Sequence, residues 1–335
     1  MSEQSHSVLI TGATGALGFR VVNSFHDAGF LVRTFSLDPP QDGIFPSEVE
    51  NIIGDITNID AVASAMNGIK CVVHMAALLH IDDPPLSMLP MYERINIKGT
   101  ASIVEASIRE RIRRIVFFST IAVYGPGKGD TFSEESLPAP ASLYARTKLK
   151  AEQMVLAAKG VDGRALGSVL RLGAVYGIRV KGNYKRLVQV LARRRFIPVG
   201  DGKNLRTVVY DKDVGTAALL AATNPEAAGR IYNVTDGQLH TLNEIIGTIC
   251  STLGRKPPRF SLPVRPTRTL IGLIEKGSRT FGFKPPVTRD MIDKYTEDMA
   301  VDGTLIQKEL AFMPQYDLGT GWKETIKEMR ARGEL

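Results

Sequence analysis

The chain of 335 residues contains two cysteines, Cys71 and Cys250, and a single tryptophan. Two cysteines cannot form a disulfide framework, and Cys71 begins the apolar run Cys71–Val73, which is typical of a protein core. No stretch approaches the roughly 18 consecutive apolar residues that a membrane-spanning helix requires. The first seven residues are polar and lack the apolar stretch of a signal peptide. These absences predict a cytoplasmic protein without a membrane span.

The net charge of the chain is small for its length: 42 Lys and Arg residues against 35 Asp and Glu residues give +7. The basic residues are scattered, and the run Arg193–Arg195 lacks the interleaved aromatic residues typical of nucleic-acid-binding surfaces. We therefore expect no nucleic-acid partner and interpret this run as the solvated end of a helix. A modest positive field that attracts anionic small molecules is the functional alternative.

Apolar runs of strand length alternate with helical patterns through the first half of the chain. Such alternation predicts an α/β fold, a Rossmann-like doubly wound parallel sheet, with ligands bound beyond the carboxyl ends of its strands. Residues 1–177 are expected to form a dinucleotide-binding domain, with returning segments at about 207–240, and residues 178–335 mainly a smaller α/β substrate-binding lobe. We expect strands at 8–10, 31–35, 49–53, 71–74, 115–119, 168–171 and 259–262, and helices near 16–28, 61–66, 92–109, 144–158 and 267–283.

A glycine-rich turn joins the first expected strand to the first expected helix. Its sequence, TGATGALG, covers residues 11–18 and has glycines at 12, 15 and 18. Such a turn presents backbone N–H groups and a helix N-terminus, both of which bind pyrophosphate. Gly12 permits the tight turn, Gly15 lets phosphates approach the backbone, and Gly18 lets the helix pack closely on the strand. The spacing differs from G-x-G-x-x-G, so the turn alone is weak evidence.

Three residues further along are suited to proton transfer. Tyr144 and Lys148 are four residues apart in an expected helix and therefore share one face. A phenol titrates near pH 10, so catalysis near pH 7 requires its pKa to fall by about 3 units, and a nearby ammonium favours the phenolate. Thr120 follows the expected strand 115–119, where its hydroxyl can hold the oxygen that Tyr144 protonates or deprotonates. An ordinary exposed helix also explains Tyr144 and Lys148, so the interpretation depends on the accompanying motifs.

This ordered set of motifs resembles the extended short-chain dehydrogenase/reductase superfamily, within it the NAD-dependent epimerase/dehydratase family, over nearly the whole chain. Further matching motifs are GDI at 54–56, HMAA at 74–77, NIKGT at 96–100 and LRL at 170–172. The resemblance implies catalytic roles for Thr120, Tyr144 and Lys148, a packing role for His74, and a homodimer formed by the helices near 92–109 and 144–158. The cofactor-binding residues that it implies, besides Tyr144 and Lys148, are Gly12, Thr14, Gly15, Ala16, Leu17, Gly18, Ser36, Asp38, Asp55, Ile56, Ala76, Ala77 and Asn96.

The residues after the second expected strand bear on the choice between NAD and NADP. An acidic residue there binds the ribose hydroxyls of NAD, whereas an arginine accommodates the 2′-phosphate of NADP. Ser36 occupies the family's acidic position, Leu37 follows it, and Asp38 is two residues further on. The absence of an arginine favours NAD, although NADP is not excluded. No bound metal is predicted.

Substrate-binding residues are expected after the sheet. Residues 180–184 and 200–207 resemble nucleotide-sugar segments of the family that includes UDP-galactose 4-epimerase, in which the counterparts of Asn183 and Arg206 hold the nucleotide diphosphate. An arginine fork suits a diphosphate because it forms paired charge-assisted hydrogen bonds. Ala174 departs from the Asn of those epimerases. The substrate-binding residues implied are Thr120, Asn183 and Arg206, and the partner is a nucleotide sugar linked to UDP.

The two residues after the strand-end threonine narrow the choice of reaction. Ile121 and Ala122 stand where similar sugar 4,6-dehydratases carry an acidic pair, which disfavours dehydration. A nucleotide-diphosphate-sugar 4-epimerase, which acts through a transient 4-keto sugar, needs only the three catalytic residues and a nicotinamide. An NAD(P)H-dependent reductase of a 4-keto nucleotide sugar needs the same set and is the alternative. Asn183 and Arg206 argue against a steroid- or flavonol-type dehydrogenase, and the intact catalytic set argues against a scaffold without activity.

Overall fold

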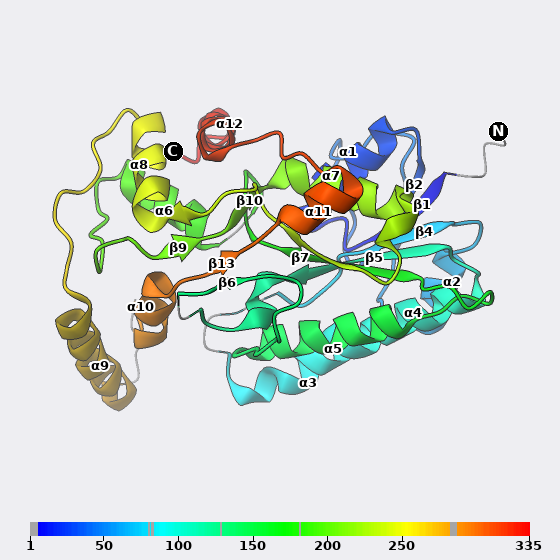
Figure 1. The fold of residues 1–335 in the computed structure, drawn as a ribbon, viewed down its shortest axis with the longest axis horizontal. Helices are drawn as coiled ribbons and strands as arrows, with labels where there is room; N and C mark the ends of the chain where they lie inside the picture. The colour runs from blue at the N-terminus through cyan, green and yellow to red at the C-terminus, as the bar shows by residue number, and fades with distance from the viewer. Residues whose placement is uncertain (1–5, 80, 82–83, 128, 181, 282–286) are drawn as a thin grey trace.

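The computed structural model describes residues 6–79, 81, 84–127, 129–180, 182–281 and 287–335. A seven-stranded sheet with the order β11-β7-β5-β4-β1-β2-β3 forms its centre (Figure 1). Every pairing in this sheet is parallel, so the predicted doubly wound α/β fold is confirmed. The strands are β1 Ser7–Thr11, β2 Leu31–Ser36, β3 Glu50–Ile53, β4 Cys71–His74, β5 Arg114–Thr120, β7 Gly167–Leu172 and β11 Ile231–Val234.

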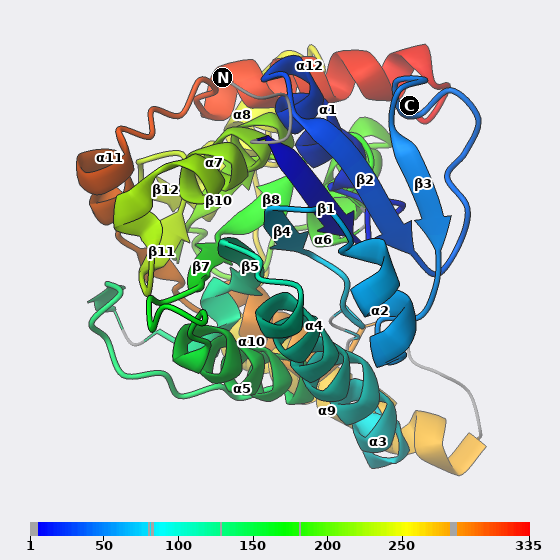
Figure 2. The same ribbon diagram turned by 90° about the vertical axis from the view of Figure 1, so that its right-hand side faces the viewer.

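Helices cover both faces of the sheet (Figures 1 and 2). One face carries α1 (Gly18–Asp27), α7 (Asp211–Thr223) and α11 (Thr304–Leu310), and the other carries α2 (Ile59–Ala65), α4 (Gly99–Arg109) and α5 (Leu143–Ala157). The helix expected at 92–109 begins earlier, as α3 (Leu89–Tyr92), and continues through a π-helical segment, Glu93–Lys98, into α4. Among the described residues, no helix is both long and apolar enough to cross a lipid bilayer.

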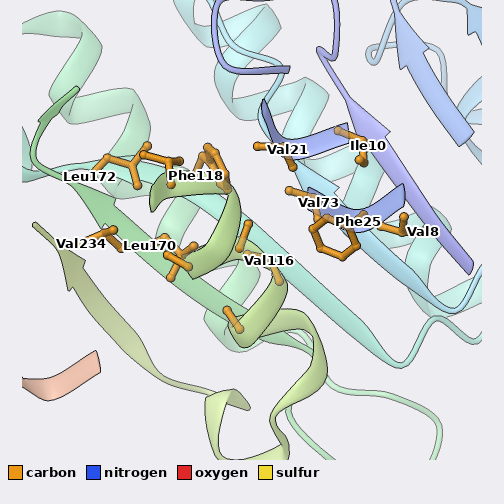
Figure 3. Packing of buried hydrophobic residues seen from close by; sticks show 14 of the residues in the cluster. Val8, Ile10, Val21, Phe25, Val73, Val116, Phe118, Leu170, Leu172 and Val234 are labelled. Atoms are coloured by element: carbon orange, nitrogen blue, oxygen red, sulfur yellow. The ribbon is translucent and has the colours of Figure 1, made fainter. Parts of the chain in front are cut away.

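The largest apolar cluster lies between the sheet and α1 and α7. Figure 3 shows aliphatic side chains of successive strands meeting Val21 and Phe25 of α1, all of them buried. His74 belongs to the sheet's interior as well: its Nδ1 lies 2.8 Å from Oγ1 of Thr11 and its Nε2 lies 3.0 Å from Oγ1 of Thr100. Burial lowers the pKa of His74 to about 3, so the ring is neutral and has the packing role expected of it.

The second lobe is built from short elements around a buried tryptophan, Trp322, which stacks on Tyr176. Its helices are α6 (Asn183–Ala192), α8 (Leu242–Thr252), α9 (Val264–Phe281), α10 (Arg289–Thr296) and α12 (Leu318–Ala331). Its strand pairs are β8 (Ala174–Tyr176) with β10 (Val208–Tyr210), β9 (Leu205–Arg206) with β12 (His240–Thr241), and β6 (Thr131–Phe132) with β13 (Ala300–Val301).

Two expectations for the second lobe differ from the structure: the strand is absent, and the helix begins earlier than expected. Residues 259–262 do not form a strand, because only Leu262 makes an isolated bridge, to Val199. The helix expected from residue 267 is present but begins three residues earlier, at Val264. The run Arg193–Arg195 is exposed at the end of α6, as predicted.

Candidate active site

A cavity of about 1790 Å³ lies at the carboxyl ends of the sheet strands and extends into the second lobe. Two of the site residues predicted from the sequence, Asn96 and Arg206, do not contribute to its wall. All the others line it: Gly12, Thr14, Gly15, Ala16, Leu17, Gly18, Ser36, Asp38, Asp55, Ile56, Ala76, Ala77, Thr120, Tyr144, Lys148 and Asn183.

The glycine turn between β1 and α1 has no room for side chains at two of its glycines. Gly12 has a φ of +71°, and a Cβ placed there would lie 2.7 Å from Cα of Ala76. A Cβ at Gly18 would lie 1.7 Å from the carbonyl oxygen of Ala13. No side chain caps the N-terminus of α1, whose first residue, Gly18, lines the cavity together with the turn before it. The uncapped N–H groups and the helix dipole therefore face a space that suits a pyrophosphate.

The end of β2 brings oxygen atoms to the same part of the cavity. The hydroxyl of Ser36 is buried and accepts a hydrogen bond of 3.3 Å from the backbone N–H of Thr14, in the glycine turn. Asp38 is exposed on the cavity wall. Asp55 also lines the wall and forms an ion pair of 3.3 Å with Arg94. These groups are hydrogen-bond acceptors placed where ribose and adenine follow a pyrophosphate in this fold.

A hydrogen bond joins the β2–β3 connection to the second lobe across this end of the cavity. The Nη2 atom of Arg179 donates to Oε1 of Gln41 at 2.7 Å, and both residues line the wall. The guanidinium of Arg179 also lies 5.3 Å from the ring centre of Phe19, in the first turn of α1. The sequence pattern gave no sign of an arginine near the cofactor because this one comes from a distant segment.

Asn96 supports the cavity wall from behind. It is buried, accepts a 2.7 Å hydrogen bond from the N–H of Leu78 and donates one of 3.1 Å to the carbonyl of the same residue. Tyr92, which was not predicted as a site residue, similarly donates to the carbonyl of Leu79 and accepts from the N–H of Ile81. Both side chains therefore hold the segment after β4 in place, and the residues of that segment line the cavity.

The predicted catalytic residues converge on the cavity from β5 and α5. Ser142 caps α5 by accepting from the N–H of Ala145 at 3.1 Å, so the helix begins with Tyr144 in its first turn. Thr120 ends β5 and its Oγ1 accepts from the N–H of Ala122 at 3.2 Å. The ammonium of Lys148 is buried against Phe117, with Nζ 3.9 Å from the ring centre. Burial lowers the pKa of Lys148 to about 7.

The pKa of Tyr144 differs from expectation. Burial raises it above the ordinary value of a phenol, and the neighbouring phenol of Tyr92 raises it further. The sequence had suggested a lowered pKa because of Lys148. The desolvation of the phenol, which disfavours its charged form, outweighs the expected effect of that ammonium. The protein without ligand therefore holds Tyr144 in the protonated state.

A buried ion pair lies one helical turn beyond Lys148. Oε2 of Glu152 accepts from Nη2 of Arg171 at 2.7 Å, and the two side chains are only 1% and 3% exposed. The guanidinium of Arg171 also lies 4.8 Å from the ring centre of Tyr124. The carboxylate of Glu152 opposes the fall in the pKa of Lys148. Tyr144, Lys148 and Glu152 therefore form one stripe along α5 at intervals of four residues.

Basic side chains line the part of the cavity that faces the second lobe. Asn183 opens α6, whose N-terminus has no side-chain cap, and Lys185 and Arg186 follow in its first turn. Lys185 forms an ion pair of 2.7 Å with Glu334. A helix N-terminus with two cations beside it is suited to a second phosphate group. Only Asn183 among these was predicted, although Lys185 and Arg186 stand close behind it in sequence.

Arg206 is engaged elsewhere. Its guanidinium donates to the carbonyl oxygens of Lys294 and Tyr295 at the end of α10, the latter at 2.8 Å. Carbonyl groups at a helix C-terminus attract cations, which explains this position. Asp213 lies within α7, which begins at Asp211, and its carboxylate accepts from the N–H groups of Gln315 and Tyr316.

Residues 8–235 match the profile described as the NAD dependent epimerase/dehydratase family. This match covers more than half of the chain. The chain belongs to the NAD dependent epimerase/dehydratase family. The resemblance drawn from its motifs is thereby confirmed, as is the prediction of an NAD-dependent enzyme.

Individual relatives cover nearly the whole chain. The chain is 27% identical, over 325 residues, to N-acetyl-alpha-D-glucosaminyl-diphospho-ditrans,octacis-undecaprenol 4-epimerase of Escherichia coli O157:H7, covering 96% of this chain and 94% of the relative. It is 27% identical over 329 residues to UDP-glucose 4-epimerase of Vibrio cholerae, with the same coverage. The solved structure of MoeE5 in complex with UDP-glucose and NAD superposes with a TM-score of 0.76 at 26% identity, covering 97% of this chain and 99% of MoeE5. Proteins similar to this chain thus include epimerases of diphosphate-linked sugars.

Proposed function

We propose that this protein is a 4-epimerase of UDP-linked sugars that retains NAD and acts through a transient 4-keto sugar. One observation carries the proposal: Thr120, Tyr144 and Lys148 line the same cavity as the glycine turn and the basic start of α6. The relatives that act on UDP-glucose or on a diphosphate-linked amino sugar support the same substrate class.

We also propose a homodimer formed through α4 and α5, which pack side by side on one face of the sheet.

The cavity is large enough for two ligands at once. Its volume of about 1790 Å³ exceeds the roughly 300–1,000 Å³ of a pocket for one drug-sized molecule. The uncapped N-terminus of α1 suits the pyrophosphate of NAD, and the uncapped N-terminus of α6 suits the diphosphate of the sugar nucleotide. NAD, when bound, would supply the nicotinamide that accepts a hydride from C4 of the sugar and donates it back.

The residues of the chain would handle the proton of the sugar's 4-hydroxyl. Thr120 Oγ1 would hold that oxygen, and Oη of Tyr144 would accept the proton as the 4-keto sugar forms and return it afterwards. Lys148 would bind the cofactor's ribose and stabilise the phenolate. Because burial raises the pKa of Tyr144, deprotonation requires additional positive charge in the cavity, so we expect the phenolate to form only in the ligand-bound enzyme.

The test combines turnover with cofactor analysis. Purified protein without added cofactor would be incubated with UDP-glucose, UDP-galactose and their N-acetyl derivatives, and inversion at C4 followed by proton NMR. We expect inversion by the wild type, a loss of about 10²–10⁴-fold in Tyr144→Phe, and NAD retained by both, as measured by mass spectrometry. Tyr316→Phe is the matched control, since that hydroxyl binds Lys212 outside the cavity wall.

Two results would replace the proposal. Stoichiometric consumption of NADH or NADPH by a 4-keto sugar nucleotide, without inversion of the epimerase substrates, would identify a reductase. Full turnover by Tyr144→Phe would show that the phenol is not the proton acceptor.

A further inference from the structure

Two segments of the chain carry a strong excess of positive charge, residues 178–200, with seven Lys or Arg residues and no acid, and residues 255–279. Residues 255–279, here called the basic segment, contain seven Lys or Arg residues and one acid, Glu275. Their net charge is therefore +6, out of +7 for all 335 residues.

The helix at the centre of this segment, α9, has a face that no part of the described chain covers. Leu270, Leu273 and Ile274, here called the apolar strip, are 59%, 62% and 42% exposed, and their spacing places them on one face. The basic residues Arg265 and Lys276 are exposed beside this face. Figure 1 shows α9 at the periphery of the molecule, next to α10.

The opposite face of α9 belongs to the active-site cavity. Glu275 and Ser278 line the cavity wall. Two ion pairs attach this side to α10: Arg268 to Asp293 at 2.7 Å, and Glu275 to Arg289 at 2.7 Å. The apolar strip is therefore held outward by fixed contacts, and it lies directly behind one wall of the substrate site.

Exposed apolar side chains gather around the same part of the cavity. Of the 21 large apolar side chains exposed in the described residues, 11 lie within residues 79–91 and 260–287. The first of these segments lines the cavity through Leu79 and Ile81, and the second through Glu275 and Ser278. Both α3, within the first segment, and α9 lie at the lower edge of the molecule in Figures 1 and 2, separated along the horizontal direction of Figure 1. Exposed apolar patches of this kind mark interaction sites.

We propose that the basic segment and the apolar strip form a docking surface for an anionic lipid bilayer. An interfacial helix of this type inserts leucine and isoleucine side chains just below the headgroups while its Lys and Arg side chains contact lipid phosphates. Docking places the cavity beside the membrane surface, where sugars carried on lipid diphosphates would be accessible. This last point rests on the proposed function, whereas the docking itself does not.

The composition favours a bilayer over other anionic partners. Nucleic-acid surfaces interleave basic with aromatic residues, whereas the basic segment has one aromatic residue, the exposed Phe260, and its residues between Arg265 and Lys276 include the three aliphatic side chains of the apolar strip. A second copy of the chain is disfavoured by charge, since two segments of net charge +6 would face each other.

The test is cosedimentation of the full chain with vesicles of phosphatidylcholine, with and without phosphatidylglycerol. We expect binding only to the anionic vesicles, weakening as salt is added. The double variants Leu270→Ser/Leu273→Ser and Arg259→Gln/Arg265→Gln should each bind about tenfold less tightly or worse, because each removes over 1.4 kcal/mol of apolar or electrostatic interaction.

The matched control is Leu137→Ser/Val161→Ser, whose side chains are 89% and 76% exposed in other parts of the chain, and which should bind as the wild type does. Circular dichroism melting curves verify that every variant is folded. Absence of binding to anionic vesicles would overturn the proposal, as would undiminished binding of the apolar variant. If RNA competes with the vesicles for binding and only the charge variant abolishes that competition, the surface is a general polyanion site. If the protein is a dimer that the apolar variant dissociates, the surface binds a second copy of the chain. Epimerase activity toward soluble UDP-sugars, unchanged in these variants, separates failure of docking from failure of the proposed function.

Discussion

Replacing Lys148 with methionine should stabilise the ligand-free protein while abolishing its activity. The Lys148 side chain is 2% exposed, and burial lowers its pKa from the ordinary 10.5 to about 7. One pKa unit corresponds to about 1.4 kcal/mol, so holding the ammonium in this position costs about 5 kcal/mol. The contact with the Phe117 ring, lost in the variant, offsets up to about 2 kcal/mol of this. We therefore expect Lys148→Met to raise the free energy of unfolding by about 3 kcal/mol at pH 6.

The effect should depend on pH with a definite sign. Below pH 7 the lysine is protonated in both the folded and the unfolded wild type, so the full cost is present. Between pH 7 and 10.5 the unfolded state binds more protons than the folded state, so the wild type gains stability as pH rises. Near pH 10 the remaining cost is less than about 1 kcal/mol. The advantage of Lys148→Met should therefore shrink steadily across this range.

The assay is urea unfolding followed by circular dichroism at pH values from 6 to 10. Lys150→Met is the matched control, because Lys150 is exposed on the same helix and its replacement should leave the pH dependence unchanged. A destabilised Lys148→Met variant at pH 6, or a difference between variant and wild type that does not vary with pH, would refute the reasoning.

Two further predictions concern the buried ion pair and the glycine turn. Glu152→Gln should lower the free energy of unfolding by about 3–5 kcal/mol in urea, because it leaves a buried cation unpaired, whereas Asp293→Asn, in an exposed pair, should lower it by less than about 1 kcal/mol; equal effects would contradict the burial argument. Gly12→Ala should abolish the retention of NAD in the purified protein, as measured by mass spectrometry, whereas Gly43→Ala should not. Both glycines have positive φ, but only Gly12 has a neighbouring backbone in the way, so loss of binding in both variants would contradict the steric explanation.

The sheet and the cofactor end of the cavity could be predicted because their signals are local. Each central strand is a short apolar run, and the carboxyl end of a parallel strand is a place where ligands bind. The residues after β1, β2, β4 and β5 therefore reach the cavity without any knowledge of distant contacts. The second lobe lacks such signals, since strands of two or three residues are too short to show a period.

The errors at the site come from long-range contacts. Arg206 binds carbonyls 88 and 89 positions away in sequence, and nothing near Arg206 indicates that α10 ends beside it. Glu152 lies in a helix rich in charged residues, where it has the pattern of a surface residue until Arg171 of β7 is placed beneath it. The pKa of Tyr144 likewise depends on how much water the fold excludes, which the spacing of Tyr144 and Lys148 does not report.

The hydrogen bond between Arg179 and Gln41 has a kinetic consequence. It connects two stretches of chain that line the cavity from opposite halves of the protein, and we call it the latch. An exposed bond of this kind contributes only about 1 kcal/mol, so thermal fluctuations open it often, and its tethered partners meet again without diffusing apart. We therefore expect the residence time of a dinucleotide behind the latch to depend partly on how these two side chains fluctuate, in addition to how strongly the glycine turn binds phosphate.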